Sequence, residues 1–148
     1  MDKQDLENAA ALLNEHRDGF TEVMGFRYVL ATPTEVEVEW IVGPQHLQPY
    51  GIVHGGVHAG VIETVCSVGA GLAAAERGQP GSVVGLENHT SFIRAVRTGT
   101  KLKARATPVT RGKTTQVWEA EVRNEAGELI ASGTVRLLST QDIGPATK

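Results

Sequence analysis

A single carboxylate interrupts an otherwise apolar stretch, since Glu63 is the only formally charged residue between positions 55 and 75. Burying a carboxylate is costly unless hydrogen bonds or cations offset the lost hydration, so such a residue is a candidate acid, base or nucleophile. The alternative is a structural glutamate that pairs with an arginine such as Arg94 or reaches solvent at a rim. Ser67 follows at i+4 on the same helical face. Its hydroxyl either supports the Glu63 carboxylate or a water, or bonds back to the carbonyl of residue 63.

The second chemical feature is the triplet His54-Gly55-Gly56, which directly precedes this stretch. Glycines at the start of a helix let a ligand approach the backbone N–H groups, and the helix dipole favours negative charge there. The triplet therefore predicts an oxyanion hole, a set of donors that stabilises a carbonyl oxygen as it becomes negative. Glycine at a helix entry is also a common turn device, and we expect His54 to be a hydrogen-bonded scaffold residue rather than a base.

The spacing of these two features has a consequence for assembly. Gly55 and Glu63 are eight positions apart, which in a helix at ~1.5 Å per residue is about 12 Å. Two groups at this distance cannot both touch one carbonyl. If both act on the same substrate, they come from two subunits related by a two-fold axis. The spacing therefore predicts a homo-oligomer with its active site at the dimer interface.

Other catalytic chemistries lack their sequence signatures. There is no phosphate-binding loop, no dinucleotide fingerprint and no Gly-x-Ser-x-Gly elbow, and we expect no cofactor. The lone Cys66 is interpreted as a small core residue rather than a nucleophile. The histidines show no zinc-type spacing, so we expect no metal; they are His16, His46, His54, His58 and His89.

One long helix and a set of strands must position these groups. The region from Val57 to Ala75 has no polar face, so a helix there must be buried on several sides. It stops at Glu76-Arg77-Gly78, shortly before Pro80. Its small residues either let a second copy approach through a two-fold interface or only pack the helix on its own sheet; they are Gly60, Gly69, Ala70, Gly71, Ala73 and Ala74.

Alternation with a period of two marks the strands. Residues 26–30 and 36–42 predict a hairpin with its turn at Pro33-Thr34. Further strands are predicted at 82–92, 101–106, 118–123 and 129–137. One buried helix with five or six mostly antiparallel strands predicts an α+β fold in which the sheet wraps around the helix.

Length and charge bound the remaining possibilities. A chain of 148 residues suits one domain with a single core. The net charge of −3 and pI near 5.9 argue against a nucleic-acid partner. With one cysteine, no signal-peptide pattern and no run of about 20 apolar residues, we expect a cytoplasmic protein without membrane contact. The expected layout is an N-terminal region 1–18 with an amphipathic helix at 5–16, a domain at 19–138 and a flexible tail at 139–148.

Together these residues resemble the hotdog thioesterases, in particular the PaaI-like branch and its 4-hydroxybenzoyl-CoA thioesterase subgroup that uses glutamate. The resemblance covers roughly residues 19–138 and implies the hotdog fold, an antiparallel sheet wrapped around one long buried helix. Its motifs are Gln48 with Gly51-Ile52-Val53-His54-Gly55-Gly56, then Glu63, then Asn88-His89-Thr90-Ser91-Phe92 with Arg94.

The resemblance also implies roles for individual residues. Glu63 would attack the thioester carbonyl or activate water for that attack, and Gly55 N–H of the partner subunit would polarise the carbonyl oxygen. Gln48 would orient substrate or water, Ser67 would support deacylation and His54 would shape the loop. The implied substrate and coenzyme A contacts are Tyr50, Asn88, His89, Arg94, Lys113 and Thr114, with the nucleotide phosphates near the turn 111–114. Ala95 after Arg94, and Lys113 itself, depart from the family pattern and leave the exact coenzyme A contacts open.

The expected function is hydrolysis of a small aromatic or medium-chain acyl-CoA to free acid and coenzyme A by a homotetramer, a dimer of dimers. A non-catalytic hotdog protein that binds acyl-CoA is the first alternative, and the buried Glu63 disfavours it. A hotdog hydratase or dehydratase is the second, and the absence of a histidine with Pro-Gly a few residues on disfavours the dehydratase. The pocket candidates tolerate several acyl groups; they are Tyr50, Val57, Ile62 and Phe92.

Overall fold

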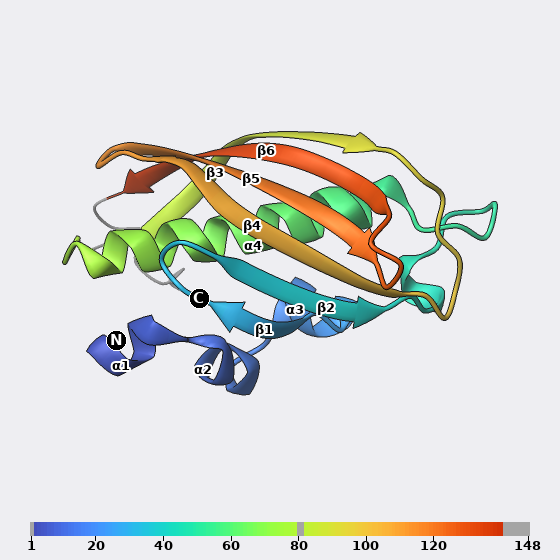
Figure 1. Cartoon of the computed structure of the whole chain (residues 1–148), viewed down its shortest axis with the longest axis horizontal. Helices are drawn as coiled ribbons and strands as arrows, with labels where there is room; N and C mark the ends of the chain where they lie inside the picture. Colours follow the sequence, from blue (N-terminus) through green and yellow to red (C-terminus); the bar gives the residue numbers. More distant parts are fainter. Residues whose placement is uncertain (1, 80–81, 141–148) are drawn as a thin grey trace, which may run out of the picture.

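A six-stranded antiparallel sheet forms the body of the protein in a computed structural model that describes residues 2–79 and 82–140 (Figure 1). The strand order is β1-β2-β4-β5-β6-β3, which leaves β1 and β3 at the two edges. The strands are β1 (Arg27–Ala31), β2 (Val36–Ile41), β3 (Ser82–Phe92), β4 (Lys101–Arg111), β5 (Thr115–Asn124) and β6 (Leu129–Thr140).

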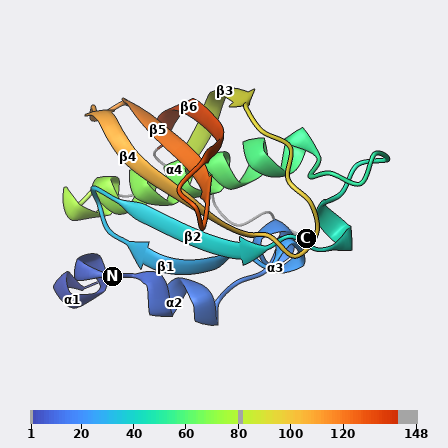
Figure 2. The same ribbon diagram turned by 45° about the vertical axis from the view of Figure 1, so that its right-hand side comes forward.

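One long helix, α4 (Gly55–Glu76), lies along the inner face of this sheet, and the strands curl around it (Figures 1 and 2). The alternation in the strands explains the arrangement, since Leu102, Ala104 and Ala106 of β4 are buried while the residues between them are exposed. The predicted α+β architecture is therefore confirmed, including the hairpin of β1 and β2. By length and composition α4 is apolar enough to cross a membrane. However, 61% of its apolar 18-residue segment is buried inside the fold, as in a core helix.

The N-terminal region differs from the expected single helix over residues 5–16. It forms α1 (Lys3–Glu7) and α2 (Ala10–Glu15), and α3 (Gly19–Met24) follows as an unpredicted helix. The break comes at Asn8, whose backbone is extended (φ −164°, ψ 103°). Its side-chain oxygen accepts hydrogen bonds from the Ala10 N–H (3.0 Å) and the Ala31 N–H (3.1 Å). The prediction was wrong because an asparagine that bonds the backbone competes with the helix.

This N-terminal region covers the β1 edge of the sheet. The Ala9 N–H donates to the Ala31 carbonyl at 2.8 Å. The Asn14 side chain accepts from the Tyr28 N–H and donates to the Tyr28 carbonyl. Ala9 and Ala10 are buried in the same core cluster as the sheet. Backbone groups at the β1 edge of the sheet are thus hydrogen-bonded within the chain.

At the other end of the domain, β6 continues to Thr140, past the boundary expected at residue 138. The remainder of the expected tail, residues 141–148, lies outside the described residues.

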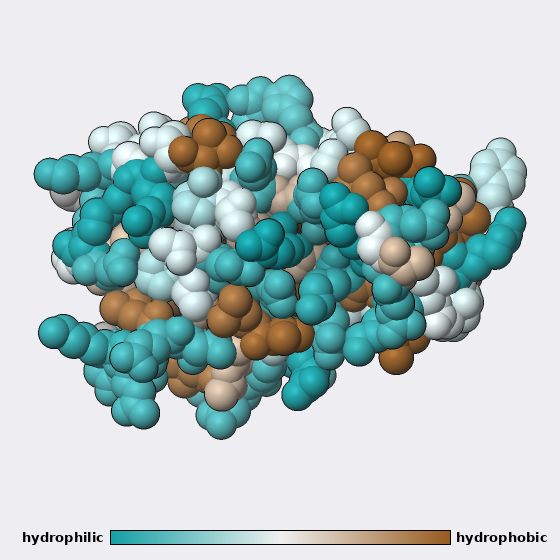
Figure 3. Space-filling view, viewed as in Figure 1, coloured by the Kyte–Doolittle hydropathy of each residue, from teal (hydrophilic) through white to brown (hydrophobic). Residues whose placement is uncertain are grey.

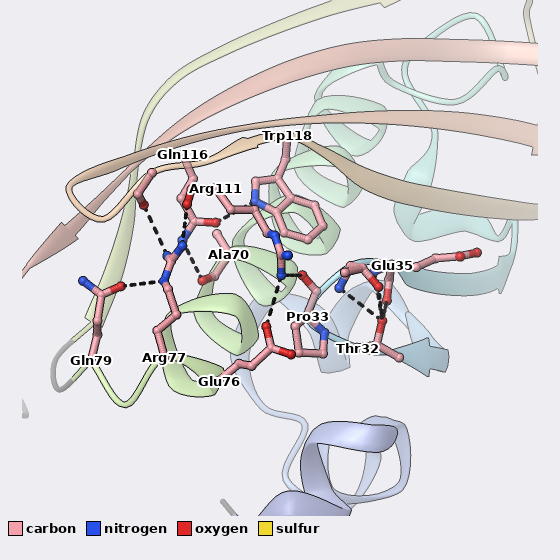
Figure 4. A network of polar contacts seen from close by, with 12 residues as sticks. Thr32, Pro33, Glu35, Ala70, Glu76, Arg77, Gln79, Arg111, Gln116 and Trp118 are labelled. Carbon is pink, nitrogen blue, oxygen red and sulfur yellow. Dashed lines mark hydrogen bonds and ion pairs between the residues drawn. The ribbon is translucent and has the colours of Figure 1, made fainter.

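Polar contacts fix the C-terminal end of α4 to the turn between β4 and β5 (Figure 4). The Arg77 guanidinium donates to the carbonyls of Arg111 and Gly112, and the Gln79 amide donates to the Lys113 carbonyl at 3.0 Å. Deeper in the core, the Gln116 amide donates to the Ala70 carbonyl (2.9 Å) and accepts from the Trp118 indole (3.0 Å). These bonds set where α4 lies along the sheet, and with it the position of Glu63.

Candidate active site

Glu63 is half-buried in the middle of α4 and faces β3. The Asn88 side-chain amide of β3 donates one hydrogen bond to Glu63 Oε2 and one to the Ala59 carbonyl, both at 3.0 Å. The Thr90 hydroxyl donates to Asn88 Oδ1 at 2.6 Å. The bond from Thr90 orients the Asn88 amide so that its NH2 group, and not its oxygen, faces the Glu63 carboxylate and the Ala59 carbonyl.

Gly85 provides the space that the Glu63 carboxylate occupies. A Cβ atom at Gly85 would lie 2.0 Å from Glu63 Oε1. The pairing of β3 with β6 is irregular between Gly85 and Glu87. This bulge lets Gly85 and Asn88, three positions apart, both contact Glu63, whereas regular alternation would put them on opposite faces. Sequence reasoning missed Gly85, although a glycine inside a strand often marks a close approach.

The residues of the predicted oxyanion hole lie at the start of α4. His54 is the N-cap, and its Nδ1 accepts a hydrogen bond from the Gly56 N–H at 2.8 Å. No group in residues 2–79 and 82–140 accepts from the Gly55 N–H. The Phe92 ring lies beside Gly55, where an added Cβ would be 2.8 Å from Cζ. His54 therefore caps α4, and the Gly55 N–H has no acceptor within the described residues.

One chain does not bring these two groups together. Gly55 and Glu63 lie on the same uninterrupted helix, which puts them about 12 Å apart along its axis. A carbonyl held by the Gly55 N–H is therefore out of reach of Glu63 in the same chain.

The β3 edge is open where a second copy would have to approach. Its neighbour β6 covers one side only, and β3 and the segment after it expose Leu86 (48%), Phe92 (60%) and Ile93 (53%). Figure 3 shows apolar surface gathered where β3 ends and α4 begins. Exposed strand edges with apolar side chains are templates for pairing with another chain.

Gln48 and Tyr50 lie on the loop that precedes α4. Gln48 Oε1 accepts from the Tyr50 N–H, and the Gln48 N–H donates to the Ile52 carbonyl at 2.9 Å. Tyr50 is 84% exposed. In the single chain most of the Tyr50 side chain is therefore in contact with solvent.

Ser67 and Cys66 follow Glu63 on α4. Neither hydrogen bond considered for Ser67 is formed within the part of the chain that the structure describes, and it is Thr64 that bonds back, to the Gly60 carbonyl at 2.8 Å. Burial raises the pKa of the Cys66 thiol, and the Glu63 charge adds to this effect. The thiol stays protonated, which suits a core residue rather than a nucleophile.

The remaining predicted contact residues are distributed over both ends and both faces of the sheet. His89 lies on the outer face beside Glu87, at a groove of about 500 Å³ that Arg105 and Thr107 also line. Arg94 follows the end of β3 and pairs with Glu128 at 3.3 Å. Lys113 and Thr114 lie at the opposite end, beside the start of β3 and the end of β6. Of the predicted contacts, only Asn88 touches Glu63.

Comparison with known proteins matches residues 50–131 to the thioesterase superfamily. The proofreading thioesterase EntH of Klebsiella pneumoniae is 33% identical over 118 residues, which cover 80% of this chain and 83% of EntH. The structure of the thioesterase HI1161 from Haemophilus influenzae is 30% identical with a TM-score of 0.79, covering 96% of this chain and 94% of that one. A variant of the phenylacetic acid degradation protein PaaI from Thermus thermophilus is 28% identical with a TM-score of 0.72, covering 83% and 100%.

Proposed function

The chain belongs to the thioesterase superfamily and is a thioester hydrolase with the hotdog fold, and on this premise we propose that Glu63 is the catalytic carboxylate of an acyl-CoA thioesterase. The substrate class is a small aromatic or medium-chain acyl-CoA, which is hydrolysed to the free acid and coenzyme A. The observation that carries the proposal is the Glu63 carboxylate itself, held by Asn88 in the space that Gly85 leaves.

The chemistry divides between the first residue of α4, Gly55, and its middle, where Glu63 lies. The thioester carbonyl oxygen accepts a hydrogen bond from the Gly55 N–H, where the helix dipole stabilises the negative charge that develops on it. On the other side of the carbonyl, Glu63 either takes a proton from water as the water oxygen attacks the carbon, or attacks the carbon itself and forms an anhydride that water then cleaves. In both routes the C–S bond breaks and coenzyme A leaves as a thiolate. The thiolate takes up the proton that Glu63 removed from water in the first route, and the proton released when water cleaves the anhydride in the second.

Pairing of two β3 edges would complete the site. If two copies of β3 pair in antiparallel fashion with His89 of one copy opposite His89 of the other, the extra residue in the bulge between Gly85 and Glu87 puts residue 92 of one copy opposite residue 85 of the other. Phe92 adjoins Gly55, and Gly85 adjoins Glu63. This pairing would bring the Gly55 N–H of one subunit to the Glu63 carboxylate of the other. It is also the arrangement that the distance along α4 requires.

The same pairing joins residues proposed to bind the nucleotide of coenzyme A. Within one chain Arg94 and Lys113 lie at opposite ends of β3, an 11-residue strand, which spans about 35 Å. Across the two-fold axis, Arg94 of one subunit would approach Lys113 and Thr114 of the other. His89 faces the outer surface, so any contact it makes with coenzyme A is away from the thioester. We propose a homotetramer, a dimer of dimers, as the active form.

A thiol-release assay with a panel of acyl-CoA thioesters tests the proposal on Glu63→Ala and Glu63→Gln. Loss of the carboxylate is expected to lower turnover by about 10²–10⁴-fold. Glu15→Gln is the control, because it makes the same change at an exposed position of another helix, α2, and is expected to leave turnover unchanged. Equal turnover in wild type and Glu63→Ala would overturn the catalytic role. Tight acyl-CoA binding by the wild type without thiol release would favour the non-catalytic alternative instead.

A further inference from the structure

His89 and Glu87 form a polar pair on the outer face of β3. The Nε2 atom of His89 is hydrogen-bonded to Glu87 Oε1, and the two side chains are 74% and 45% exposed. The other carboxylate oxygen, Glu87 Oε2, accepts from the Arg136 guanidinium of β6 at 3.1 Å. Arg136 therefore holds the carboxylate with its second oxygen directed at the imidazole.

The pair is open to small ligands from the outer side of the sheet. His89 lines the groove of about 500 Å³ that runs across this face. The other charged residues that line the groove are one arginine and two glutamates, Arg105, Glu119 and Glu121. This lining favours a cation over an anion beside His89.

One chain does not supply enough ligands for a metal ion. No group of three histidine, cysteine, aspartate or glutamate side chains in residues 2–79 and 82–140 could hold one. The proposed pairing of two β3 edges changes this count. With His89 of one copy opposite His89 of the other, their Cβ atoms lie about 4.5–5.5 Å apart, and each Glu87 lies two positions away on the same face. Histidine spacing within one sequence, which predicts no metal, carries no information about a partner chain.

The four side chains that meet in this way match the ligand preferences of Zn²⁺. Zinc binds imidazole nitrogen and carboxylate oxygen at about 2.0–2.2 Å, and its structural sites are almost always tetrahedral. Because Nε2 of His89 and Oε1 of Glu87 already face one another, a cation that replaces the proton between them binds both atoms and releases that proton to solvent. Arg136 then orients the carboxylate ligand from behind, as hydrogen-bonded partners of metal ligands commonly do.

We propose that the His89 and Glu87 side chains of two subunits form a binding site for a divalent transition-metal cation, such as Zn²⁺, at the two-fold axis of the dimer. The inference rests on the β3 pairing in the proposed function and adds a structural cation site to it. The site lies on the outer face of the sheet, whereas Glu63 lies on α4 at the inner face, so the cation takes no part in thioester hydrolysis. Because only the paired form offers four ligands, the cation stabilises the dimer.

Titration with ZnCl₂ after dialysis against EDTA tests the site. Calorimetry is expected to show one tightly bound Zn²⁺ per two chains. Free Zn²⁺ at about 100 times its Kd is expected to lower the dissociation constant of the dimer about 100-fold, because the ion binds the dimer and not the monomer. Sedimentation velocity on serial dilution measures this constant. His89→Asn and Glu87→Gln are expected to lose both effects, since each substitution removes two of the four ligands.

Two matched variants control for zinc bound elsewhere on the surface. Glu121→Gln removes another outer-face carboxylate that is paired with an arginine, Arg123, at 2.8 Å. His16→Asn removes an exposed imidazole in the N-terminal region. Both variants are expected to bind Zn²⁺ as the wild type does. Equal affinity in His89→Asn, binding of one ion per chain, or zinc binding without any change in dimer dissociation overturns the cation site.

Thiol release separates this inference from the proposed function. Glu63→Ala is expected to bind Zn²⁺ with wild-type stoichiometry, because the carboxylate lies on the other side of the sheet. A dimer that binds no Zn²⁺ but retains Glu63-dependent thiol release overturns the cation site alone. Binding of one ion per two chains that depends on His89, together with full turnover in Glu63→Ala, supports the cation site and overturns the catalytic role of Glu63 alone.

Discussion

The side-chain amide of Asn88 bridges two elements, because it donates to the Glu63 carboxylate and to the Ala59 carbonyl at 3.0 Å each. The first bond orients the proposed catalytic group, and the second fixes β3 against α4. Asn88 is therefore interpreted as a positioning residue rather than as the coenzyme A contact that the family resemblance implied.

Replacing Asn88 by leucine is expected to lower kcat by about 10–100-fold, because a hydrogen bond to a charged group contributes about 1.5–3 kcal/mol. Asn88→Asp is expected to be slower still and to move the acid limb of the pH–rate profile to higher pH, since a second carboxylate disfavours ionisation of the first. Asn124→Leu is the control, because it removes an amide–carboxylate bond of the same length, to Glu128, in an exposed turn. Wild-type rates and an unshifted profile in both Asn88 variants would contradict the positioning role.

Gly85→Ala tests the space around the carboxylate. The added methyl group would lie 2.0 Å from Glu63 Oε1, so the carboxylate has to move. Because the displaced atom is the end of a flexible side chain, we expect thiol release to fall by at least about tenfold while the melting temperature changes little. Gly71→Ala is the matched control, since a Cβ there meets nothing within 4 Å, and alanine in a helix is expected to stabilise by about 0.5–1 kcal/mol. Full activity in Gly85→Ala would show that the carboxylate position is not critical.

Patterns in the sequence were sufficient to predict the long apolar helix and the strands. The apolar stretch predicted as a helix over 57–75 is α4 (Gly55–Glu76), and the period-two segments are the six strands. The break at Asn8 was not predictable, because the bond that causes it is made with Ala31, which is 23 positions away. Local propensity carries no information about such a partner.

The candidate site likewise contains residues that could be predicted from the sequence and residues whose role could not. Glu63 and Gly55 were found from residue type, since one is a lone charge in an apolar helix and the other a glycine at a helix start. The role of Asn88 depends on which face of β3 it occupies, and the irregular pairing between Gly85 and Glu87 shifts the alternation. Asn88 and His89, adjacent in the predicted motif, therefore lie on opposite faces of the strand.

The buried imidazole of His58 predicts a pH dependence of stability. Its pKa is about 4 in the folded state and about 6.5 in the unfolded chain. The unfolded state binds more protons between these values, so the native state keeps its full stability above about pH 6.5 and loses part of it as the pH falls toward 4. The loss is about 3 kcal/mol.

We expect His58→Leu to remove this part of the pH dependence, as measured by urea unfolding at pH 4.5 and pH 7.5. The unfolding free energy should change less between the two pH values in the variant than in the wild type. The reduction should be a measurable fraction of about 3 kcal/mol. His46→Leu is not a suitable control, because it would leave bonded partners of His46 unsatisfied. His16→Leu, at the exposed residue that follows α2, is suitable. Equal differences in wild type and His58→Leu would rule out a buried neutral imidazole.

The open edge of β3 predicts a subunit interface that a single charge can disrupt. Leu86→Asp places a carboxylate on that edge, and we expect a lower mass by light scattering and loss of thiol release together. Val23→Asp is the control, since Val23 is 65% exposed on α3, away from the β3 edge. A monomeric Leu86→Asp variant with full activity would show that one chain suffices for catalysis.

Replacing Gly55 separates its N–H from its lack of a side chain. Gly55→Pro removes the donor at the first residue of α4, where proline is tolerated, and His54 has the extended backbone (φ −63°, ψ 131°) that a following proline requires. Gly55→Ala retains the N–H while placing a comparable Cβ beside Phe92. We expect Gly55→Pro to lower kcat by about 10²–10³-fold, as for loss of an oxyanion-hole donor, and Gly55→Ala to lower it far less. Similar losses in both variants would assign the effect to the Phe92 contact instead.

Mixing the inactive variants Glu63→Ala and Gly55→Pro tests whether two subunits share one site. In a mixed dimer with shared sites, one site carries both substitutions, and the other combines an intact Glu63 from one chain with an intact Gly55 from the other. Co-refolding the two variants is therefore expected to restore activity, with up to half of the mixed dimer's sites functional. If each site were built within a single chain, every site in the mixture would carry one substitution and no activity would return. Recovery after co-refolding, compared with each variant refolded alone, distinguishes the two arrangements, because no single chain in the mixture contains both intact groups.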